Sequence, residues 1–543
     1  MKLLSLLSAI LVLLLSVVSL HFLHSNYWSN LRWSLSLQSS PVADLVVRNA
    51  LIYTSDASLP FADSMAVSNG RILRVGNYSS VVQQDLPGYG TKELNLEGKI
   101  VVPGFIDSHV HFINGGLQMA QVELRGINNR DEFVRRVQEA VKNKKQGSWV
   151  LGGGWNNDLW GGELPVASWI DDITPYNPVW LSRTDGHMGL ANSMALKLAG
   201  ITKYTEDPIG GTIMKTTSGE PNGLLIDSAM KLLLPWIPEV SVDERREALV
   251  RASNLALMRG VTTVVDFGRY VPGTSVQLSW DDFSDVYHWT DTSGKMMIRV
   301  CLFFPMETWS HLLPYVDDPH NYGLLVTELE SLFNMTMASD KSGLQVAIHA
   351  IGDKANDLIL DVYESVGSTN GMRDRRFRIE HAQHLVPGST ARFGEQGIVA
   401  SVQPDHLLDD ADSAIKKLGV ERAQKESYLF RSLLASNAQL AFGSDWPVAD
   451  INPLGSIKAA MKRIPPGWES AWISSECLTL HDALNAYTIS AARASFLDND
   501  LGSLSPGKMA DFVVLSTDSW DDFAAEGSAS VEATFVGGLQ AYP

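Results

Sequence analysis

The stretch "GKIVVPGFIDSHVHF", residues 98–112, is an apolar run that ends in two histidines one residue apart. Successive residues of a strand point to opposite faces, so Asp107, His109 and His111 share one face. Two imidazoles so placed have Cα atoms about 6 to 7 Å apart, close enough to bind one metal ion. The alternative is a pair of hydrogen-bonded histidines at a strand end. Further ligands are therefore needed before the pattern indicates a metal site.

Three further polar residues stand at corresponding places later in the chain. His349 in "AIHAIGD", His381 in "RIEHAQH" and Asp445 in "FGSDWP" each lie where an apolar run stops. Enzymes with a TIM-type barrel place catalytic groups at the carboxyl ends of their strands. Any one of these residues could be a buried polar residue with a hydrogen-bond partner, but their shared position favours a common metal site. The candidate metal ligands are His109, His111, His349, His381 and Asp445.

The middle of the chain, residues 104–501, has the pattern of a TIM-type (β/α) barrel. Apolar, strand-like runs alternate there with helical patterns, which is typical of parallel α/β folds. A large insertion, at about residues 113–250, follows the first strand. The later strand-like runs are "VTTVVDFG", "IRVCLFF", "LQVAIHAIGD", "RFRIEHAQH", "GIVASVQPDH" and "LAFGSDWP".

The two ends of the chain predict a small β-sandwich domain beside the barrel. Residues 43–103 have the pattern of short strands joined by Asn-Gly and Glu-Gly turns. Residues 502–543 return to the same strand character. Because the barrel pattern lies between these two segments, we expect them to form one domain.

Residues 1–25 are predicted to be a signal anchor or a signal peptide. The uncharged run "LLSLLSAILVLLLSVVSL" follows Lys2. Its length approaches bilayer thickness and exceeds the usual core of a signal peptide, which favours an anchor. With Lys2 on the cytosolic side, the catalytic domain would lie in the lumen of the endoplasmic reticulum or the secretory pathway. The sequons at Asn77 and Asn334 could be glycosylated there, which would make the protein a glycoprotein.

Composition excludes several other classes of protein. A chain of 543 residues with 45% apolar content can bury a large core. Its net charge of −18 and its lack of a dense basic run argue against nucleic acid as a partner. Cys301 and Cys477 are far apart and have no CxxC spacing, so any metal must use nitrogen and oxygen ligands.

The ordered motifs resemble those of the metal-dependent amidohydrolase superfamily, in its branch similar to N-substituted formamide deformylase. The resemblance runs from about residue 43 to the C-terminus and implies a hydrolase of carbon–nitrogen bonds other than peptide bonds, acting on a small-molecule amide or formamide. It also implies one or two divalent metal ions, with zinc favoured. The matching pieces are "PGFIDSHVH", "IHAIGD", "RIEHAQ", "GSDWPV" and "LGSLSPGKMADFVVL".

The resemblance assigns a role to each candidate ligand. His109 and His111 would hold one metal ion from the first strand, and Asp445, from the eighth, would bind metal and take the proton of the attacking water. His349 and His381 would come from the fifth and sixth strands. A bound cation of this kind lowers the pKa of its water and polarises a carbonyl, which suits amide hydrolysis.

One element of the family pattern is absent. Binuclear members carry a carboxylated lysine on the fourth strand as a bridge between two ions. Residues 305–343 contain no strand-like run with a lysine, and Lys341 has the pattern of a loop residue. We predict a splice form or gene model that lacks a segment of about 30 to 40 residues, roughly one strand-helix unit. A single ion could still be held by His109, His111, His349 and Asp445, with His381 orienting the substrate.

The insertion carries candidate substrate contacts in "LGGGWNNDLWGG" and "PVWLSRTDGHMGL". Its glycine-rich turns and tryptophans could cover the mouth of a barrel and line a pocket. Aromatic residues are nevertheless more often part of a core, and a histidine between glycines is commonly a loop residue. The candidates are Trp155, Arg183, Asp185 and His187.

Two other functions stay open at the level of sequence. A deaminase of the same superfamily would use the same metal ligands, but typically has a glutamate three residues after the fifth-strand histidine. Gly352 occupies that position here, followed by Asp353. The second alternative is a catalytically impaired protein with a binding or signalling role, and resemblance to a plant member of the branch implies far-red light signalling.

Overall fold

The computed structural model describes residues 42–84, 88, 90–142, 144–183, 188–269, 276–304, 329–525 and 529–543. The predicted anchor, the candidates Asp185 and His187, and residues 305–328 lie outside these ranges. Within the described ranges, no helix combines the length and the apolar character that a membrane span requires.

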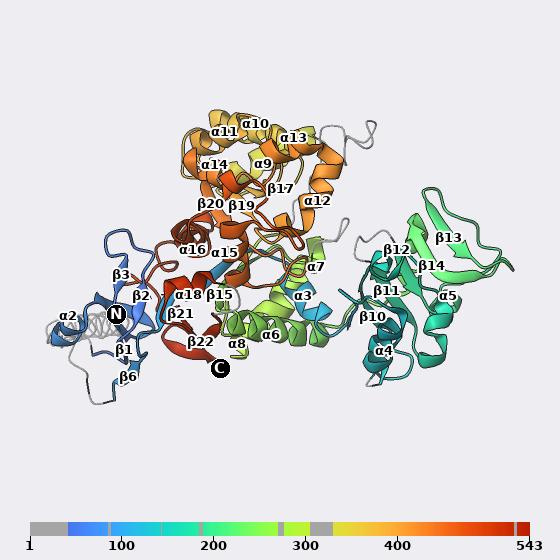
Figure 1. The fold of residues 1–543 in the computed structure, drawn as a ribbon, viewed down its shortest axis with the longest axis horizontal. Coiled ribbons are helices and arrows are strands. Elements are labelled where there is room, and N and C mark those ends of the chain that lie inside the picture. Colours follow the sequence, from blue (N-terminus) through green and yellow to red (C-terminus); the bar gives the residue numbers. More distant parts are fainter. Residues whose placement is uncertain are drawn as a thin grey trace, which may run out of the picture.

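Strands from both ends of the chain form two sheets. The strands are β1 (Leu45–Arg48), β2 (Leu51–Tyr53), β3 (Phe61–Ala62), β4 (Ser64–Ser68), β5 (Arg71–Gly76), β6 (Lys92–Asn95), β7 (Ile100–Pro103), β21 (Phe512–Leu515), β22 (Val531–Val536) and β23 (Leu539–Tyr542). One sheet has the order β23-β22-β21-β7-β2-β3, in which Val102 of β7 pairs with Val513 of β21. The other has the order β5-β4-β1-β6. Val47 and Phe512 belong to one apolar cluster that both sheets share, so the two ends of the chain pack together (Figure 1).

Seven parallel strands form two further sheets, of order β16-β15-β8 and β17-β18-β19-β20. Each of the predicted strand-like runs contains all or most of one of these strands. Their bounds are β8 (Phe105–Val110), β15 (Val261–Asp266), β16 (Arg299–Leu302), β17 (Ala347–Ala350), β18 (Arg378–His381), β19 (Val399–Val402) and β20 (Gln439–Phe442).

The two parallel sheets meet along β8 and β20. The backbone N–H of Asp445 donates to the carbonyl of His109, and that of His111 donates to the carbonyl of Trp446, both at 2.8 Å. Gly443 permits this approach, because a Cβ there would lie 2.5 Å from the backbone nitrogen of His109. On the opposite side, the described residues contain no strand between β16 and β17, and these two strands do not pair.

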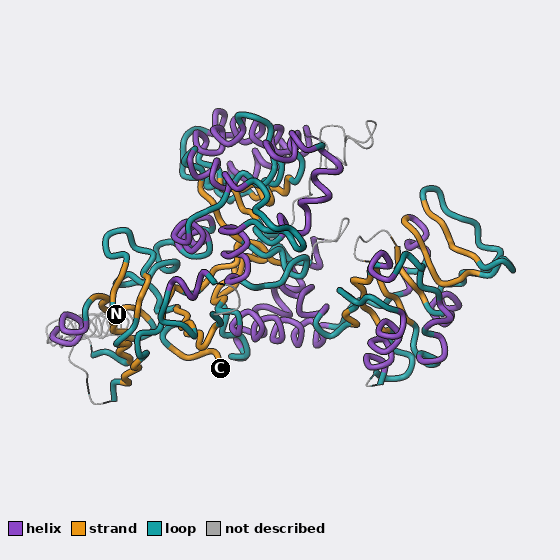
Figure 2. Tube along the Cα trace, viewed as in Figure 1, coloured by secondary structure: helices purple, strands orange, loops and turns teal. Residues whose placement is uncertain are grey.

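Helices separate the parallel strands, and α9 to α14 pack over β17 to β20 (Figures 1 and 2). Helix α10 buries Ile359, Tyr363 and Val366 along one face and ends at Asn370, before Gly371, whose φ of 82° favours glycine. Lys341 was predicted in a loop but is the last residue of α9. The helices of this region are α3 (Phe112–Gln118), α6 (Val242–Met258), α7 (Val276–Asp282), α8 (His288–Thr292), α9 (Leu329–Lys341), α10 (Asp353–Asn370), α11 (Ser389–Gln396), α12 (His406–Leu418), α13 (Val420–Glu426), α14 (Phe430–Ala435), α15 (Pro453–Lys462), α16 (Leu480–Ala486) and α17 (Ile489–Ala494). Helices α2 (Tyr78–Gln84) and α18 (Trp520–Ala524) belong to the end segments.

The insertion forms a sheet of its own, of order β13-β14-β12-β11-β10-β9. It lies apart from the other sheets, in teal and green in Figure 1, and is joined to them through α3 and α6, which contact each other. Two apolar clusters lie within it. Its elements are β9 (Val122–Glu123), α4 (Arg130–Val141), β10 (Val150–Trp155), β11 (Val179–Arg183), β12 (Met188–Ala191), α5 (Ser193–Leu198), β13 (Gly211–Lys215) and β14 (Pro221–Asp227).

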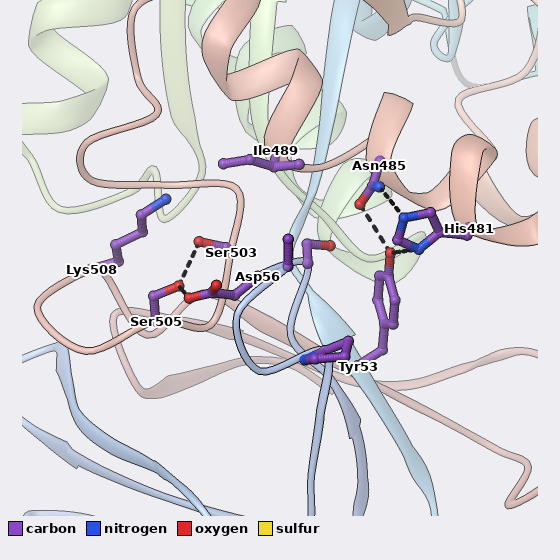
Figure 3. A pocket seen from close by; sticks show the side chains of 11 residues that line it. Tyr53, Asp56, His481, Asn485, Ile489, Ser503, Ser505 and Lys508 are labelled. Carbon is purple, nitrogen blue, oxygen red and sulfur yellow. Dashed lines mark hydrogen bonds between the residues drawn. The ribbon is translucent and has the colours of Figure 1, made fainter. Parts of the chain in front are cut away.

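A cavity of about 550 Å³ lies between the segment that follows β2 and helices α16 and α17 (Figure 3). The Tyr53 hydroxyl donates to Asn485 Oδ1 (2.9 Å) and lies 2.8 Å from His481 Nδ1. Asn485 Nδ2 lies 3.0 Å from His481 Nε2, so the three side chains close a ring. Each donor meets an acceptor if His481 carries its proton on Nδ1. Burial raises the pKa of Tyr53 to about 12, which keeps its hydroxyl protonated.

The hydrogen bonds among Tyr53, His481 and Asn485 are expected to hold β2 against α16 and so to stabilise the fold. Changing Tyr53 to Phe removes one donor and one acceptor, and should lower the free energy of unfolding by about 1 to 2 kcal/mol. Chemical denaturation measures the change. The matched control is Tyr204→Phe, because the Tyr204 side chain is exposed. Equal stability of Tyr53→Phe and the unaltered chain would contradict a fastening role.

Candidate metal centre

The structure brings the five predicted donors together at the carboxyl ends of the parallel strands. His109 lies in β8 and His111 follows it, His349 lies in β17, His381 ends β18, and Asp445 follows β20. The donor atoms form three overlapping groups, and within each group all atoms lie within 4.8 Å of one another. The groups are His109, His349 and His381; His109, His111 and Asp445; and His381, His406 and Asp445.

His406 is the member that the sequence analysis missed. It begins α12, four residues after β19 ends, and its Nε2 lies 3.9 Å from Asp445 Oδ2. The signal was present in "GIVASVQPDH", since that run was already interpreted as a strand and ends in a histidine. A polar residue at the start of a helix is common, however, and His406 has no second histidine beside it.

The direction of His109 is fixed by a buried ion-pair network. Its Nδ1 lies 2.8 Å from Glu380 Oε2, and Arg378 Nε donates to the other oxygen of Glu380 (2.7 Å). All three side chains are fully buried. Burial opposes the charge of Glu380, but Arg378 and His109 hold its pKa below the ordinary range. A charged Glu380 keeps the proton of His109 on Nδ1, which leaves the Nε2 lone pair for a metal ion.

His111 and Asp107 are also held by the surrounding backbone. His111 Nδ1 lies 2.9 Å from the carbonyl oxygen of Gly268, so its Nε2 faces the cluster. Asp107 Oδ1 accepts hydrogen bonds from the backbone N–H groups of His109 (3.2 Å) and Ser444 (2.9 Å). Burial raises the pKa of Asp107 to about 6. Asp107 thus joins β8 to the loop after β20 and supports the donors without being one of them.

The backbone at two donors is unusual. His381 has a φ of 75° and Asp445 a φ of 56°, in the left-handed region that residues with a Cβ seldom adopt. Such conformations cluster at functional sites, where the surrounding structure holds them in place. At Asp445 the backbone hydrogen bond to His109 provides this restraint.

The donor set fits a zinc-like cation. Burial lowers the pKa of His381 to about 4 and that of His349 well below its ordinary value, so both are neutral at pH 7. Burial opposes the charge of Asp445, but His109 and His111 hold its pKa well below the ordinary range. In the described part of the chain, His109 Nε2, His381 Nδ1 and Asp445 Oδ1 are buried without a hydrogen-bond partner. Neutral imidazoles and an ionised carboxylate are the ligands that zinc prefers.

The distances also suit a metal ion. His109 Nε2 and His111 Nε2 each lie 3.4 Å from Asp445 Oδ1. Two ligands bound at about 2.0 to 2.1 Å to one tetrahedral ion are about 3.3 to 3.4 Å apart. This group of three can therefore hold one ion with little movement.

A cavity of about 460 Å³ opens beside the donors. His381, His406 and Asp445 lie in its wall, with Asp410 and Lys417 along the same face of α12. Gln383 donates to Asp410, and so does Tyr428 at 2.5 Å. His384 Nδ1 lies 3.0 Å from Ser427 Oγ. The cavity gives a small polar molecule access to the donors.

The described substrate-contact candidates lie within the insertion. Trp155 is fully buried and donates from Nε1 to the carbonyl of Leu181 (2.9 Å). Arg183 donates to the side chains of Asn156 and Asn157 (3.0 Å each) and pairs with Asp158 (2.9 Å). Both side chains are thus engaged in the insertion's own structure, and neither lines the cavity beside the donors.

Histidines and an aspartate at the ends of parallel strands are features of metal-dependent hydrolases. The structure is similar to the crystal structure of an uncharacterized metal-dependent hydrolase from Pyrococcus horikoshii OT3, with a TM-score of 0.70 and 26% identity over 87% of this chain and 97% of that one. The chain belongs to the amidohydrolase family, which it matches over residues 92–542.

Two relatives confirm the predicted branch of this family. The protein LONG AFTER FAR-RED 3 of Arabidopsis thaliana is 64% identical, over 99% of this chain and 98% of its own. The N-substituted formamide deformylase of Arthrobacter pascens is 28% identical, over 92% of this chain and 98% of its own.

The support that Glu380 gives His109 should govern metal affinity. The change Glu380→Gln removes the charge that orients the imidazole, so we expect metal affinity to fall about 10- to 100-fold. Equilibrium dialysis against zinc measures the affinity. Glu476→Gln is a matched control, because Glu476 is also buried but accepts its hydrogen bonds from Ser432. An unchanged affinity in Glu380→Gln would contradict this role.

Proposed function

We propose that the chain is a metal-dependent hydrolase of carbon–nitrogen bonds in non-peptide amides, with an N-formyl or N-acyl amine as substrate. The observation that carries the proposal is a group of imidazoles around one ionised carboxylate at the wall of a cavity. Family membership and the similarity to a formamide deformylase support the same class of reaction.

The residues divide the reaction between them. His109, His111, His349 and Asp445 would hold the metal, with zinc favoured by their chemistry. When bound, the metal lowers the pKa of a water molecule and polarises the substrate carbonyl. Asp445 accepts the proton of the attacking water and returns it to the leaving amine. His381 lies on the cavity side of the group and orients the substrate.

We further propose that the seven parallel strands are a TIM-type barrel that lacks its fourth strand-helix unit, and that the sheets of the chain ends form a β-sandwich beside it. The described residues contain no strand between β16 and β17, which supports the missing unit. So does the alignment with the Arabidopsis relative, which runs over 572 positions although this chain has 543 residues. At least 29 aligned positions therefore have no residue in this chain.

The missing unit would remove the bridging lysine and its charge. Two divalent ions about 3.5 to 4 Å apart repel each other strongly unless negative ligands lie between them. We therefore expect one tightly held ion per chain.

Two alternative functions remain, a deaminase and a signalling protein without turnover. In a deaminase the residue after Gly352 would have to act as an acid, but Asp353 is buried and pairs with Arg422. A signalling role without turnover is supported by the 64% identity to a protein named for far-red responses. The activity measurements below distinguish this role from hydrolysis.

Substitutions should distinguish the residues that hold the metal from the residue that orients the substrate. His109→Ala and Asp445→Ala should abolish both metal retention and hydrolysis of N-formyl and N-acyl amines. His381→Ala should reduce turnover about 100-fold or more while it retains most of the metal. Elemental analysis and amine release measure the two properties. His288→Ala, at an exposed histidine of α8, is the control.

Several results would contradict these assignments. Two tightly held ions in the unaltered chain, or loss of all metal in His381→Ala, would refute the single-ion arrangement. Insertion of the missing unit with its lysine should raise the metal content toward two ions and raise activity. If this repaired chain holds metal but hydrolyses no amide, the signalling role replaces the enzyme.

We also propose that residues 1–25 anchor the protein in the membrane of the endoplasmic reticulum with the described residues in the lumen. Asn77 and Asn334 are both exposed, as glycosylation requires. Carbonate extraction should leave the protein in the membrane pellet, and glycosidase treatment should reduce its mass. Protein that is released by carbonate and carries no glycan at either asparagine would refute this location.

A further inference from the structure

The two oxygens of Asp445 face different histidines. Oδ1 lies 3.4 Å from His109 Nε2 and from His111 Nε2, whereas Oδ2 lies 3.9 Å from His406 Nε2. A hydrogen bond between nitrogen and oxygen seldom exceeds about 3.2 Å. The contact between His406 and Asp445 is therefore too long for a hydrogen bond, and a small inward movement would bring it to the separation of about 3.3 to 3.4 Å between two ligands of one ion.

His406 is arranged as a donor. Its Nε2 is buried without a hydrogen-bond partner in the part of the chain that the structure describes. Its ring stacks with that of His381 at a centroid distance of 6.0 Å and an angle of 19°. The donor atoms of His381, His406 and Asp445 all lie within 4.8 Å of one another. This group shares only Asp445 with the group of His109 and His111.

On the opposite side of the cluster, aromatic side chains pack against His109. Phe267 stacks on His109 at a centroid distance of 4.2 Å, and Phe303 stacks on Phe267 at 5.0 Å. The guanidinium of Arg378 lies 5.3 Å from the ring of Phe303. Aromatic faces offer no ligand atom, and the charge of Arg378 is balanced by its ion pair with Glu380. Of the three donor groups in the described residues, only that of His381, His406 and Asp445 lies entirely in the wall of the cavity.

We propose that His381, His406 and Asp445 form a second, weaker position for a divalent cation of the zinc type. Asp445 bridges it to the tighter position at His109 and His111. The proposal deepens the proposed function, because it concerns the same metal centre. The second position is the weaker one for two reasons. A single carboxylate must offset two divalent charges. The contact of His406 with Asp445 is also wider than those of His109 and His111 with Asp445.

Titration of the metal-free full chain with Co²⁺ alone tests the position, because cobalt absorbs visible light according to its ligands. The unaltered chain should bind one ion tightly and a second at least 10-fold more weakly. His406→Ala should lose the second step and keep the first, whereas His111→Ala should weaken the first step. His406→Gln serves if the alanine variant does not fold, and His288→Ala is the matched control.

The outcomes separate this inference from the proposed function. A single binding step in the unaltered chain overturns the second position, and so do two steps that remain unchanged in His406→Ala or His406→Gln. Loss of the tight step in the His406 variants would place His406 in the first position instead and also overturn the proposal. Two steps with the expected losses, in a chain that hydrolyses no amide, uphold the second position and refute the enzyme.

Discussion

The buried pair of Glu380 and Arg378 is the interaction on which the metal centre depends. Arg378 also donates to the carbonyl of Ser108 (2.7 Å) and the hydroxyl of Ser401 (3.0 Å), so it joins β18 to β8 and β19. Without Arg378 the buried charge of Glu380 would have no compensating partner. Without Glu380, His109 could carry its proton on either nitrogen. One ion pair thus sets both the spacing of three strands and the direction of a donor.

The donors at strand ends could be predicted because two local patterns coincide there. An apolar run marks a buried strand, and a polar residue where it stops faces the edge at which parallel strands meet. His349 and Asp445 satisfy both conditions. His406 satisfies only the first, since a loop separates it from its strand and a polar residue there is ordinary at the start of a helix. Its approach to Asp445 depends on tertiary packing, which a local pattern does not contain.

The position of Trp155 could not be predicted for the same reason, because it too depends on tertiary packing. Its glycine-rich surroundings are compatible with a loop over a cavity or with a strand, and the choice depends on what packs against the indole. Here Leu181 of the neighbouring strand accepts its hydrogen bond, and the ring belongs to the core of the insertion. The alternation of parallel strands and helices was predictable because periodicity extends over many residues. The separate sheet of the insertion was not, because its short strands pair across distant segments.

Apolar and charged groups lie on different sides of the candidate metal ligands. On the side of β15 and β16, His109 is covered by Phe267, and the nearby charge of Arg378 is balanced by Glu380, so that side is apolar. On the side of α12, two carboxylates, Asp410 and Asp445, lie in the cavity wall with one cation, Lys417. A second cation, or the positive end of a substrate, is therefore drawn toward α12. Because His381 lies in this wall as well, a metal ion and a substrate held there would occupy adjacent places.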